Sequence, residues 1–162
     1  HRPCRPWPPR KADRIMTTAG GRIVPAIHGL RRVEPDSEAE RALSEQLRAS
    51  HSRAQLLELV SRHSMGDSDA DAQMRRAVWR VLAARFGNGV RIGRGALASH
   101  IETFAIGDGV FIGEQAFIQG RAGGRCEIGD HAWIGPQSYL DARDIVIEEY
   151  VGWGPGARAL PG

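Results

Sequence analysis

The stretch that decides the fold runs from residue 106 to residue 142, as IGDGVFIGEQAFIQG at 106–120 and IGDHAWIGPQSYLDA at 128–142. It consists largely of six-residue units that begin with an apolar residue, usually followed by glycine, and carry a small or apolar residue at the fifth position. The units continue on both sides, as FGNGVRIGRGAL at 86–97 and IEEYVGWGPGAR at 147–158. Repeated six-residue units of this kind are typical of a parallel β-helix.

The leading residues of the units form four groups of three, with six-residue steps inside each group. They are Phe86, Ile92, Ala98; Ile106, Ile112, Ile118; Ile128, Ile134, Leu140; and Ile147, Trp153, Ala159. Three short strands per coil make a triangular prism, and the leading side chains are expected to stack inside it because no coil can bury its apolar face alone. The sequence therefore predicts a mainly β fold, an incomplete parallel β-helix over residues 86–162.

Two details of the prism follow from the same register. The glycine that usually follows a leading residue is expected near a corner, where it tolerates backbone conformations that a Cβ would strain. The extra residues at 103–105, 120–125 and 143–146 lie between the groups of three. We expect them to form loops at the corners, where they leave the stack undisturbed.

Residues 36–85 are predicted to form a helical segment of two helices with a break at 66–69. Ser37 and Glu40 match a capping box, and apolar residues recur at helical spacing on both sides of the break. This apolar stripe is expected to pack against the prism, and a helix that binds a partner is the other interpretation. Residues 1–35 are predicted to be mostly irregular, with a short apolar stretch at 23–27 that packs locally.

Composition narrows the function classes. Residues 1–85 carry 16 basic and 10 acidic side chains and residues 86–162 carry 6 and 9, so net charges of +6 and −3 sum to the +3 of the whole chain. A mildly acidic repeat half argues against nucleic acid as a partner. No apolar run is long enough to span a membrane, and the two cysteines lie far apart, so a reducing cytoplasm is the expected location.

The segments FIGEQAFIQGR at 111–121 and WIGPQSYLDARDIVIEEYVGWGPGA at 133–157 resemble the hexapeptide-repeat acyltransferases, in particular the maltose and galactoside type of sugar O-acetyltransferase. The resemblance covers residues 86–162 and extends to the helices before them. It implies a left-handed coil, a homotrimer, and acetyl-CoA bound as acyl donor along the groove between neighbouring prisms. It also implies a direct acyl transfer in which a histidine acts as general base on a sugar or glycan hydroxyl.

The catalytic histidine of the family has no counterpart in this sequence. In the branch that the chain resembles it lies shortly after WGPGA, whereas this sequence reads ARALPG and reaches its last residue at Gly162. The resemblance therefore leaves the catalytic residue unknown, and we expect a C-terminally truncated, inactive chain. Within the repeats, His100 near a corner is the alternative candidate for the base, and His131 is interpreted as a solvated surface residue.

A polar set is the candidate acceptor site. Ser99, Gln119 and Asp141 each follow the leading residue of a third strand, so they are expected to stack at one corner, with Tyr139 and Arg143 beside them. Carboxylate and amide groups at such a corner suit the hydroxyls of a sugar, and a solvated polar ladder is the other interpretation. No metal site is predicted.

Two other functions stay open at this point. One is a non-catalytic, trimeric β-helix scaffold, which the missing histidine loop favours. The other is a β-helical enzyme of the carbonic anhydrase type, which needs several histidines around a zinc ion. His100 and His131 have no third partner in the repeats, so we rank this alternative last.

Overall fold

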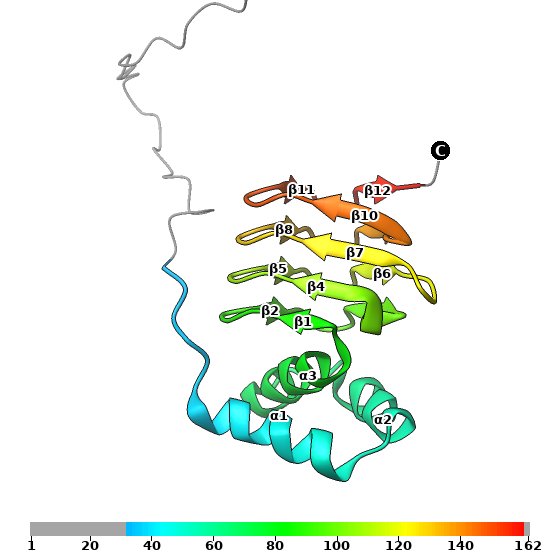
Figure 1. Cartoon of the computed structure of the whole chain (residues 1–162). Helices are drawn as coiled ribbons and strands as arrows, with labels where there is room; N and C mark the ends of the chain where they lie inside the picture. The colour runs from blue at the N-terminus through cyan, green and yellow to red at the C-terminus, as the bar shows by residue number, and fades with distance from the viewer. Residues whose placement is uncertain (1–31, 161–162) are drawn as a thin grey trace, which may run out of the picture.

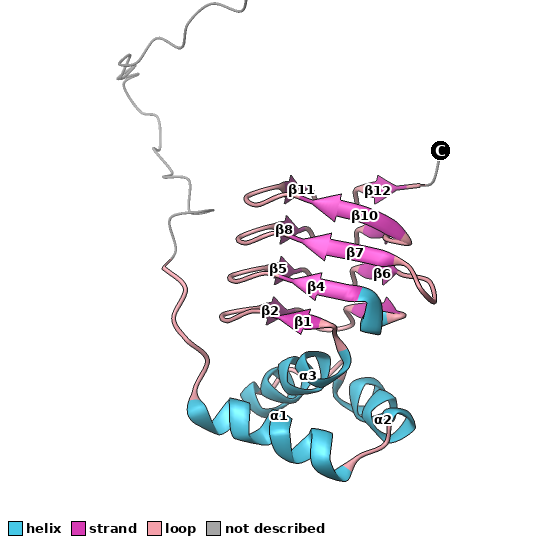
Figure 2. Cartoon of the chain, viewed as in Figure 1, coloured by secondary structure: helices cyan, strands magenta, loops and turns pink. Residues whose placement is uncertain are grey.

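The computed structural model describes residues 32–160 and consists of three helices followed by twelve short strands (Figure 1; Figure 2). The helices are α1 (Glu38–Ser50), α2 (Arg53–His63) and α3 (Asp69–Leu82). The strands are β1 (Arg85–Phe86), β2 (Arg91–Ile92), β3 (Leu97–Ser99), β4 (Phe104–Ile106), β5 (Phe111–Ile112), β6 (Phe117–Gln119), β7 (Arg125–Ile128), β8 (Trp133–Ile134), β9 (Tyr139–Asp141), β10 (Asp144–Ile147), β11 (Gly152–Trp153) and β12 (Arg158–Ala159).

The strands wind into a prism of about four coils, with one parallel sheet on each of its three faces. The sheets have the orders β1-β4-β7-β10, β11-β8-β5-β2 and β12-β9-β6-β3, so each takes one strand from every coil. In Figure 1 the front strands β1, β4, β7 and β10 run to the left and the chain returns behind them to the right while it rises away from the helices. This is a left-handed coil, and the predicted left-handed parallel β-helix is confirmed.

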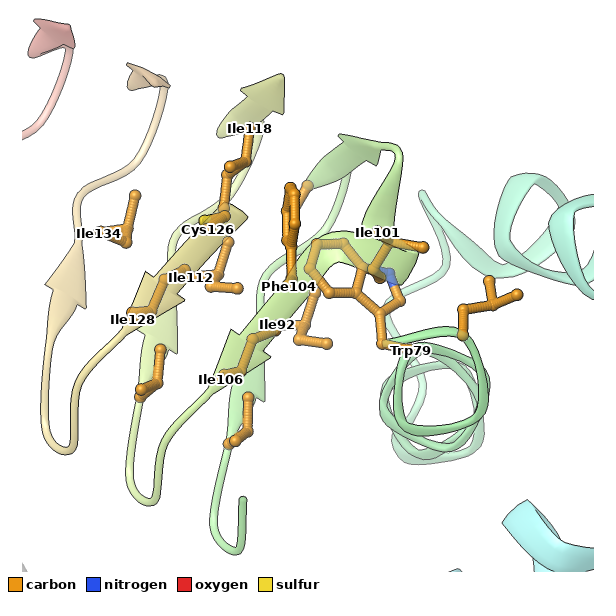
Figure 3. Packing of buried hydrophobic residues seen from close by; sticks show 14 of the residues in the cluster. Trp79, Ile92, Ile101, Phe104, Ile106, Ile112, Ile118, Cys126, Ile128 and Ile134 are labelled. Carbon is orange, nitrogen blue, oxygen red and sulfur yellow. The ribbon is translucent and has the colours of Figure 1, made fainter. Parts of the chain in front are cut away.

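The leading residues of the repeats form the core of the prism (Figure 3). Ile106, Ile112, Ile118 and Ile134 have no exposed surface, and Ile128 is 2% exposed. Burying one such side chain stabilises a fold by roughly 1.5–3 kcal/mol. Because partners in the ladder stack, as Ile106 does on Ile128, each coil completes the core of its neighbours.

Where a glycine follows a leading residue, the structure gives a different reason for it from the one expected. At Gly113 an added Cβ would lie 2.4 Å from the backbone nitrogen of Pro136, and at Gly135 it would lie 2.6 Å from the backbone of Gly154. Close approach between coils therefore excludes a side chain there. Positive φ angles occur instead two residues later, as at Gly109 (φ 67°) and His131 (φ 60°).

The extra residues between the groups of three are only partly loops. Residues 120–124 leave the prism as expected, and Ile101–Thr103 forms a short 3-10 turn. The prediction is wrong for Phe104 and Ala105, which belong to β4, for Arg125, which belongs to β7, and for residues 144–146, which belong to β10. These residues extend the first strand of a coil, because β7 and β10 pair over four positions from Arg125↔Asp144 to Ile128↔Ile147.

The helical segment contains three helices, where the sequence predicted two. The first predicted helix is interrupted at His51, and a new one begins after Ser52, whose hydroxyl accepts from the backbone N–H of Gln55 while the Gln55 side chain accepts from the backbone N–H of Ser52. This is a complete capping box, and the serine with glutamine three residues later is visible in the sequence. Helices α1 and α2 both pack on α3, which contacts β1 and β2.

Helix α3 closes the first end of the prism with a large aromatic side chain. Trp79 is 1% exposed and points toward Phe104, Ile101 and Ile92 (Figure 3). Arg75 on the same helix is 4% exposed and donates to the carbonyl oxygens of Ile92, His63 and Gly66. The helices therefore cap the first end of the β-helix. Their apolar stripe packs against the prism, which supports the first of the two interpretations.

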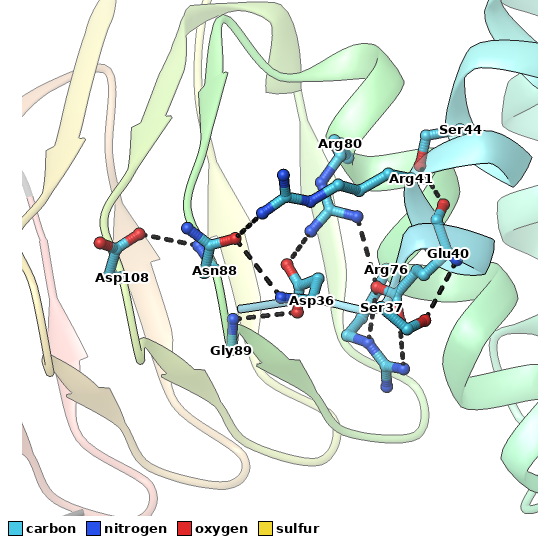
Figure 4. Close-up of polar contacts among 10 residues, drawn as sticks. All are labelled: Asp36, Ser37, Glu40, Arg41, Ser44, Arg76, Arg80, Asn88, Gly89 and Asp108. Carbon is cyan, nitrogen blue, oxygen red and sulfur yellow. Dashed lines mark hydrogen bonds and ion pairs between the residues drawn. The ribbon is translucent and has the colours of Figure 1, made fainter. Parts of the chain in front are cut away.

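A buried ion-pair network joins the segment before α1 to α3 and to the first turn of the prism (Figure 4). Glu40 is 5% exposed and accepts from Arg76 at 2.7 Å and from Arg80 at 3.4 Å. Asp36 pairs with Arg80 and accepts from the backbone N–H of Gly89 at 3.0 Å. Because the Glu40 carboxylate is used in this way, only half of the capping box predicted with Ser37 forms.

Candidate functional site

The predicted polar column forms at the corner that follows the third strand of each coil. Ser99 pairs with Gln119 and Gln119 with Asp141 in the parallel register of β3, β6 and β9. All three residues lie on the outer face of this sheet, where Ser99 and Gln119 are half-buried and the Asp141 side chain is 8% exposed. The sequence thus located the column, and its assignment to an acceptor sugar stays a prediction.

The members of this corner are bound to one another. The Tyr139 hydroxyl donates to Gln119 Oε1, and the Arg143 guanidinium donates to both oxygens of Asp141 at 2.7 Å. The hydrogen bond from Arg143 lowers the pKa of the Asp141 carboxyl, against partial desolvation that opposes the shift. The corner is therefore a paired, ionised surface on which a hydroxyl ligand would have to exchange existing partners.

His100 lies beside this corner and carries a partner that the sequence did not reveal. Its Nδ1 is 3.0 Å from Glu102 Oε1, and Glu102 Oε2 accepts from Arg53 at 2.7 Å across from helix α2. Partial burial alone would raise the pKa of Glu102, but hydrogen bonds from its own backbone, Arg53 and His100 lower it instead. An ionised carboxylate on Nδ1 fixes the ring orientation of His100.

The backbone of His100 adopts a conformation that is uncommon for residues other than glycine. His100 has φ 53°, in the left-handed region, and precedes the 3-10 turn of Ile101–Thr103. Its side chain is 45% exposed, and within residues 32–160 its one hydrogen-bond partner, Glu102, is on Nδ1 and not on Nε2. A Cβ at Gly120 would lie 3.2 Å from His100 Cβ, so the ring stands next to the loop that follows Gln119. The imidazole can therefore meet a ligand through Nε2.

A groove at a different corner was not predicted. A cavity of about 570 Å³ lies between residues 32–36 and the outer face of the β2-β5-β8-β11 sheet. In this face Arg91 lies over the ring of Phe111 at 4.9 Å, and Phe111 stacks on Trp133 at 5.5 Å. The three residues occupy the same position of the repeat in successive coils. The six-residue register of the sequence could therefore have predicted that they stack.

His131, interpreted from the sequence as a surface residue, lines this groove. Its ring stacks on Tyr150 with centroids 4.8 Å apart, and the side chain is half-buried. His131 and His100 belong to different corners of the prism, before a second strand and after a third strand respectively. The structure therefore does not bring the two repeat histidines together.

Residues 32–160 contain neither a reactive cysteine nor a group of metal ligands. Burial raises the pKa of the Cys126 thiol to about 12, so this cysteine is not a nucleophile at neutral pH. Within these residues no group of three or more His, Cys, Asp or Glu side chains could hold a metal ion. In the same part of the chain no helix has the length and apolar content that a membrane crossing requires.

Comparison with known proteins adds no relative: no protein-family model, no curated protein and no solved structure matches this chain.

Proposed function

We propose, in place of the inactive chain expected from the missing histidine loop, that this β-helix is an acyl-CoA-dependent O-acyltransferase that transfers an acetyl group from acetyl-CoA to a sugar or glycan hydroxyl, with His100 as general base. The observation that carries the proposal is the hydrogen bond between His100 Nδ1 and Glu102 Oε1 at 3.0 Å, beside the polar corner of Ser99, Gln119 and Asp141. A base held by a carboxylate next to polar groups is the minimum that direct acyl transfer to a hydroxyl requires.

In the proposed reaction each group has one task. His100 Nε2 accepts the proton of the acceptor hydroxyl while its oxygen attacks the thioester carbonyl carbon. The tetrahedral intermediate then expels the CoA thiolate, which takes the proton back from His100. Glu102 stabilises the imidazolium between these two steps, and Arg53 holds Glu102. The donor would lie between neighbouring prisms of a homotrimer, as the resemblance to sugar O-acetyltransferases implies.

The test is release of free CoA from acetyl-CoA in the presence of simple sugars. Removing a general base typically costs 10²–10⁴-fold in rate, so His100→Asn should lower CoA release by about that factor. His131→Asn is the matched control, because His131 also has a positive φ but lies at another corner. If the folded wild-type chain releases no CoA with any sugar, or if both variants behave alike, the proposal is wrong.

A non-catalytic scaffold is the second candidate, and the pairing at the polar corner favours it. Tyr139 with Gln119 and Asp141 with Arg143 already satisfy one another, which is what a structural surface needs and a sugar site does not. A scaffold predicts a stable trimer in sedimentation equilibrium together with no acetyl transfer. Acetyl transfer that depends on His100 would exclude it.

A further inference from the structure

The fourth coil of the prism has an open rim, which consists of β10, β11 and β12. Within residues 32–160 each of these strands is the last one of its sheet, at the end away from the helices (Figure 1). An edge strand offers a row of backbone N–H and C=O groups to any strand that meets it. The rim is therefore a surface that can accept further strands.

The side chains of the rim are incompletely covered. The inward residues Trp153 and Ala159 are half-buried, whereas their counterparts one coil below are fully buried. The indole N–H of Trp153 is buried without a hydrogen-bond partner in residues 32–160, although a buried tryptophan usually has one. Three more apolar side chains of this coil are exposed, namely Val146, Tyr150 and Leu160.

The corner after β10 argues against one more coil in the usual register. In the coils below this position is glycine, and a Cβ at Gly87 or Gly129 would lie 2.4 or 2.5 Å from the backbone of the next coil. In the fourth coil the same position is Glu148, whose Cβ would meet the same close approach. A partner of this rim must leave more room at this corner than a parallel coil does.

A second copy of the chain can meet the rim in one orientation. Helices α1, α2 and α3 cover the first end of the prism, so the rim cannot stack on the first end of another copy. Two rims that face each other are related by a two-fold axis, and their strands then run antiparallel. Such a contact closes on itself and does not grow into a filament.

Charge selects one of the three two-fold arrangements that a triangular rim allows. With the axis through the β11 face, β10 lies antiparallel to β12 of the partner, and the end of β10 lies opposite the start of that strand. The exposed Glu148 and Glu149 follow β10, and the exposed Arg158 begins β12, so opposite charges meet twice. The other two arrangements bring the glutamates against each other or beside the apolar Leu160.

We propose that two copies of this chain associate rim to rim about this axis, with Glu148 paired to Arg158 of the partner subunit. Val146 lies on the same side of the chain as Glu148, two residues before it, so the contact also covers this exposed apolar side chain. The association uses the end of the prism and not its sides. It therefore depends neither on the proposed acyl transfer nor on a trimer.

Sedimentation of the full chain tests the contact. Because the rim offers short strands, we expect a weak association in which the mass of the particle doubles between about 2 and about 200 µM. At the lower concentration the rims are separate, which is the state in which Gly154 is uncovered. A mass that does not double over this range, or that grows without a limit, would overturn the proposal.

Charge reversal tests the arrangement. Glu148→Arg or Arg158→Glu alone should raise the dissociation constant about ten-fold, since two symmetric ion pairs are replaced by repulsions. The double variant with both changes restores opposite charges and should associate as the wild type does.

Glu114→Arg is the matched control, because Glu114 is an exposed glutamate at a corner of the second coil, away from the rim. It should leave the dissociation constant unchanged. Single reversals without effect, a double variant as weak as either single one, or an equal loss with Glu114→Arg would each contradict the pairing.

Discussion

Replacing Gly113 by alanine should force two coils of the prism apart. The new Cβ would lie 2.4 Å from the backbone nitrogen of Pro136, whereas an ordinary contact is 3.4–4 Å. The neighbour is backbone, so the coils must separate by about 1 Å, which strains the hydrogen bond from Gly113 N–H to Ile134 O at 2.8 Å. Overpacking costs about 1–3 kcal/mol and a weakened hydrogen bond about 1 kcal/mol, so we expect a loss of about 2–4 kcal/mol in the free energy of unfolding.

The same repeat position in the last described coil supplies the control. A Cβ at Gly154 would meet nothing within 4 Å, and Gly154 has no positive φ. Gly154→Ala should therefore be neutral or stabilise by up to about 1 kcal/mol, through the lower entropy of the unfolded chain. Urea unfolding followed by circular dichroism measures both variants, with equal m-values as the check for two-state behaviour. Similar losses for the two would refute close coil contact as the reason for glycine.

Three other outcomes follow from the structure. Trp79→Ala should lower the free energy of unfolding by about 3–5 kcal/mol in urea titrations, because it opens a cavity at the capped end. The pKa of Asp71 is lowered to about 2 by hydrogen bonds from Ser68 and His63, so its stabilising contribution is complete above its ordinary pKa near 3.8 and is lost as pH falls through 2; Asp71→Asn should flatten this acid dependence in pH-dependent melting. In a variant that lacks the other cysteine, Cys126 should react with a thiol reagent at pH 8 only after unfolding, since burial raises its pKa to about 12.

The repeat register predicted the prism well because it is a periodic signal. Six-residue steps identify which side chains point inward, and the isoleucines from Ile106 to Ile134 are buried as that rule requires. The same rule predicted that Ser99, Gln119 and Asp141 lie in one column, as the strand register confirms. The repeat period does not show why a given residue type is used at a position. The glycine that follows most of the leading isoleucines was therefore attributed to backbone freedom, whereas close approach between coils requires it.

The six-residue repeat could not predict the contacts around His100. Arg53 and Glu102 are 49 residues apart, one on a helix and one in a 3-10 turn, and no repeat relates them. The groove depends in the same way on Val33, which lies outside the repeats and fits between two turns of the prism. Pairings between an irregular segment and a periodic one need the three-dimensional arrangement, whereas the helix start at Ser52 carried a local signal that was available.

The helical cap on the first end of the prism has a consequence for biosynthesis. During translation α1, α2 and α3 leave the ribosome before any strand, and the exposed face of α3 with Trp79 is the first surface that β1 and β2 meet. Each finished coil then offers unpaired backbone N–H and C=O groups to the next one, so we expect the prism to fold coil by coil from the amino-terminal side.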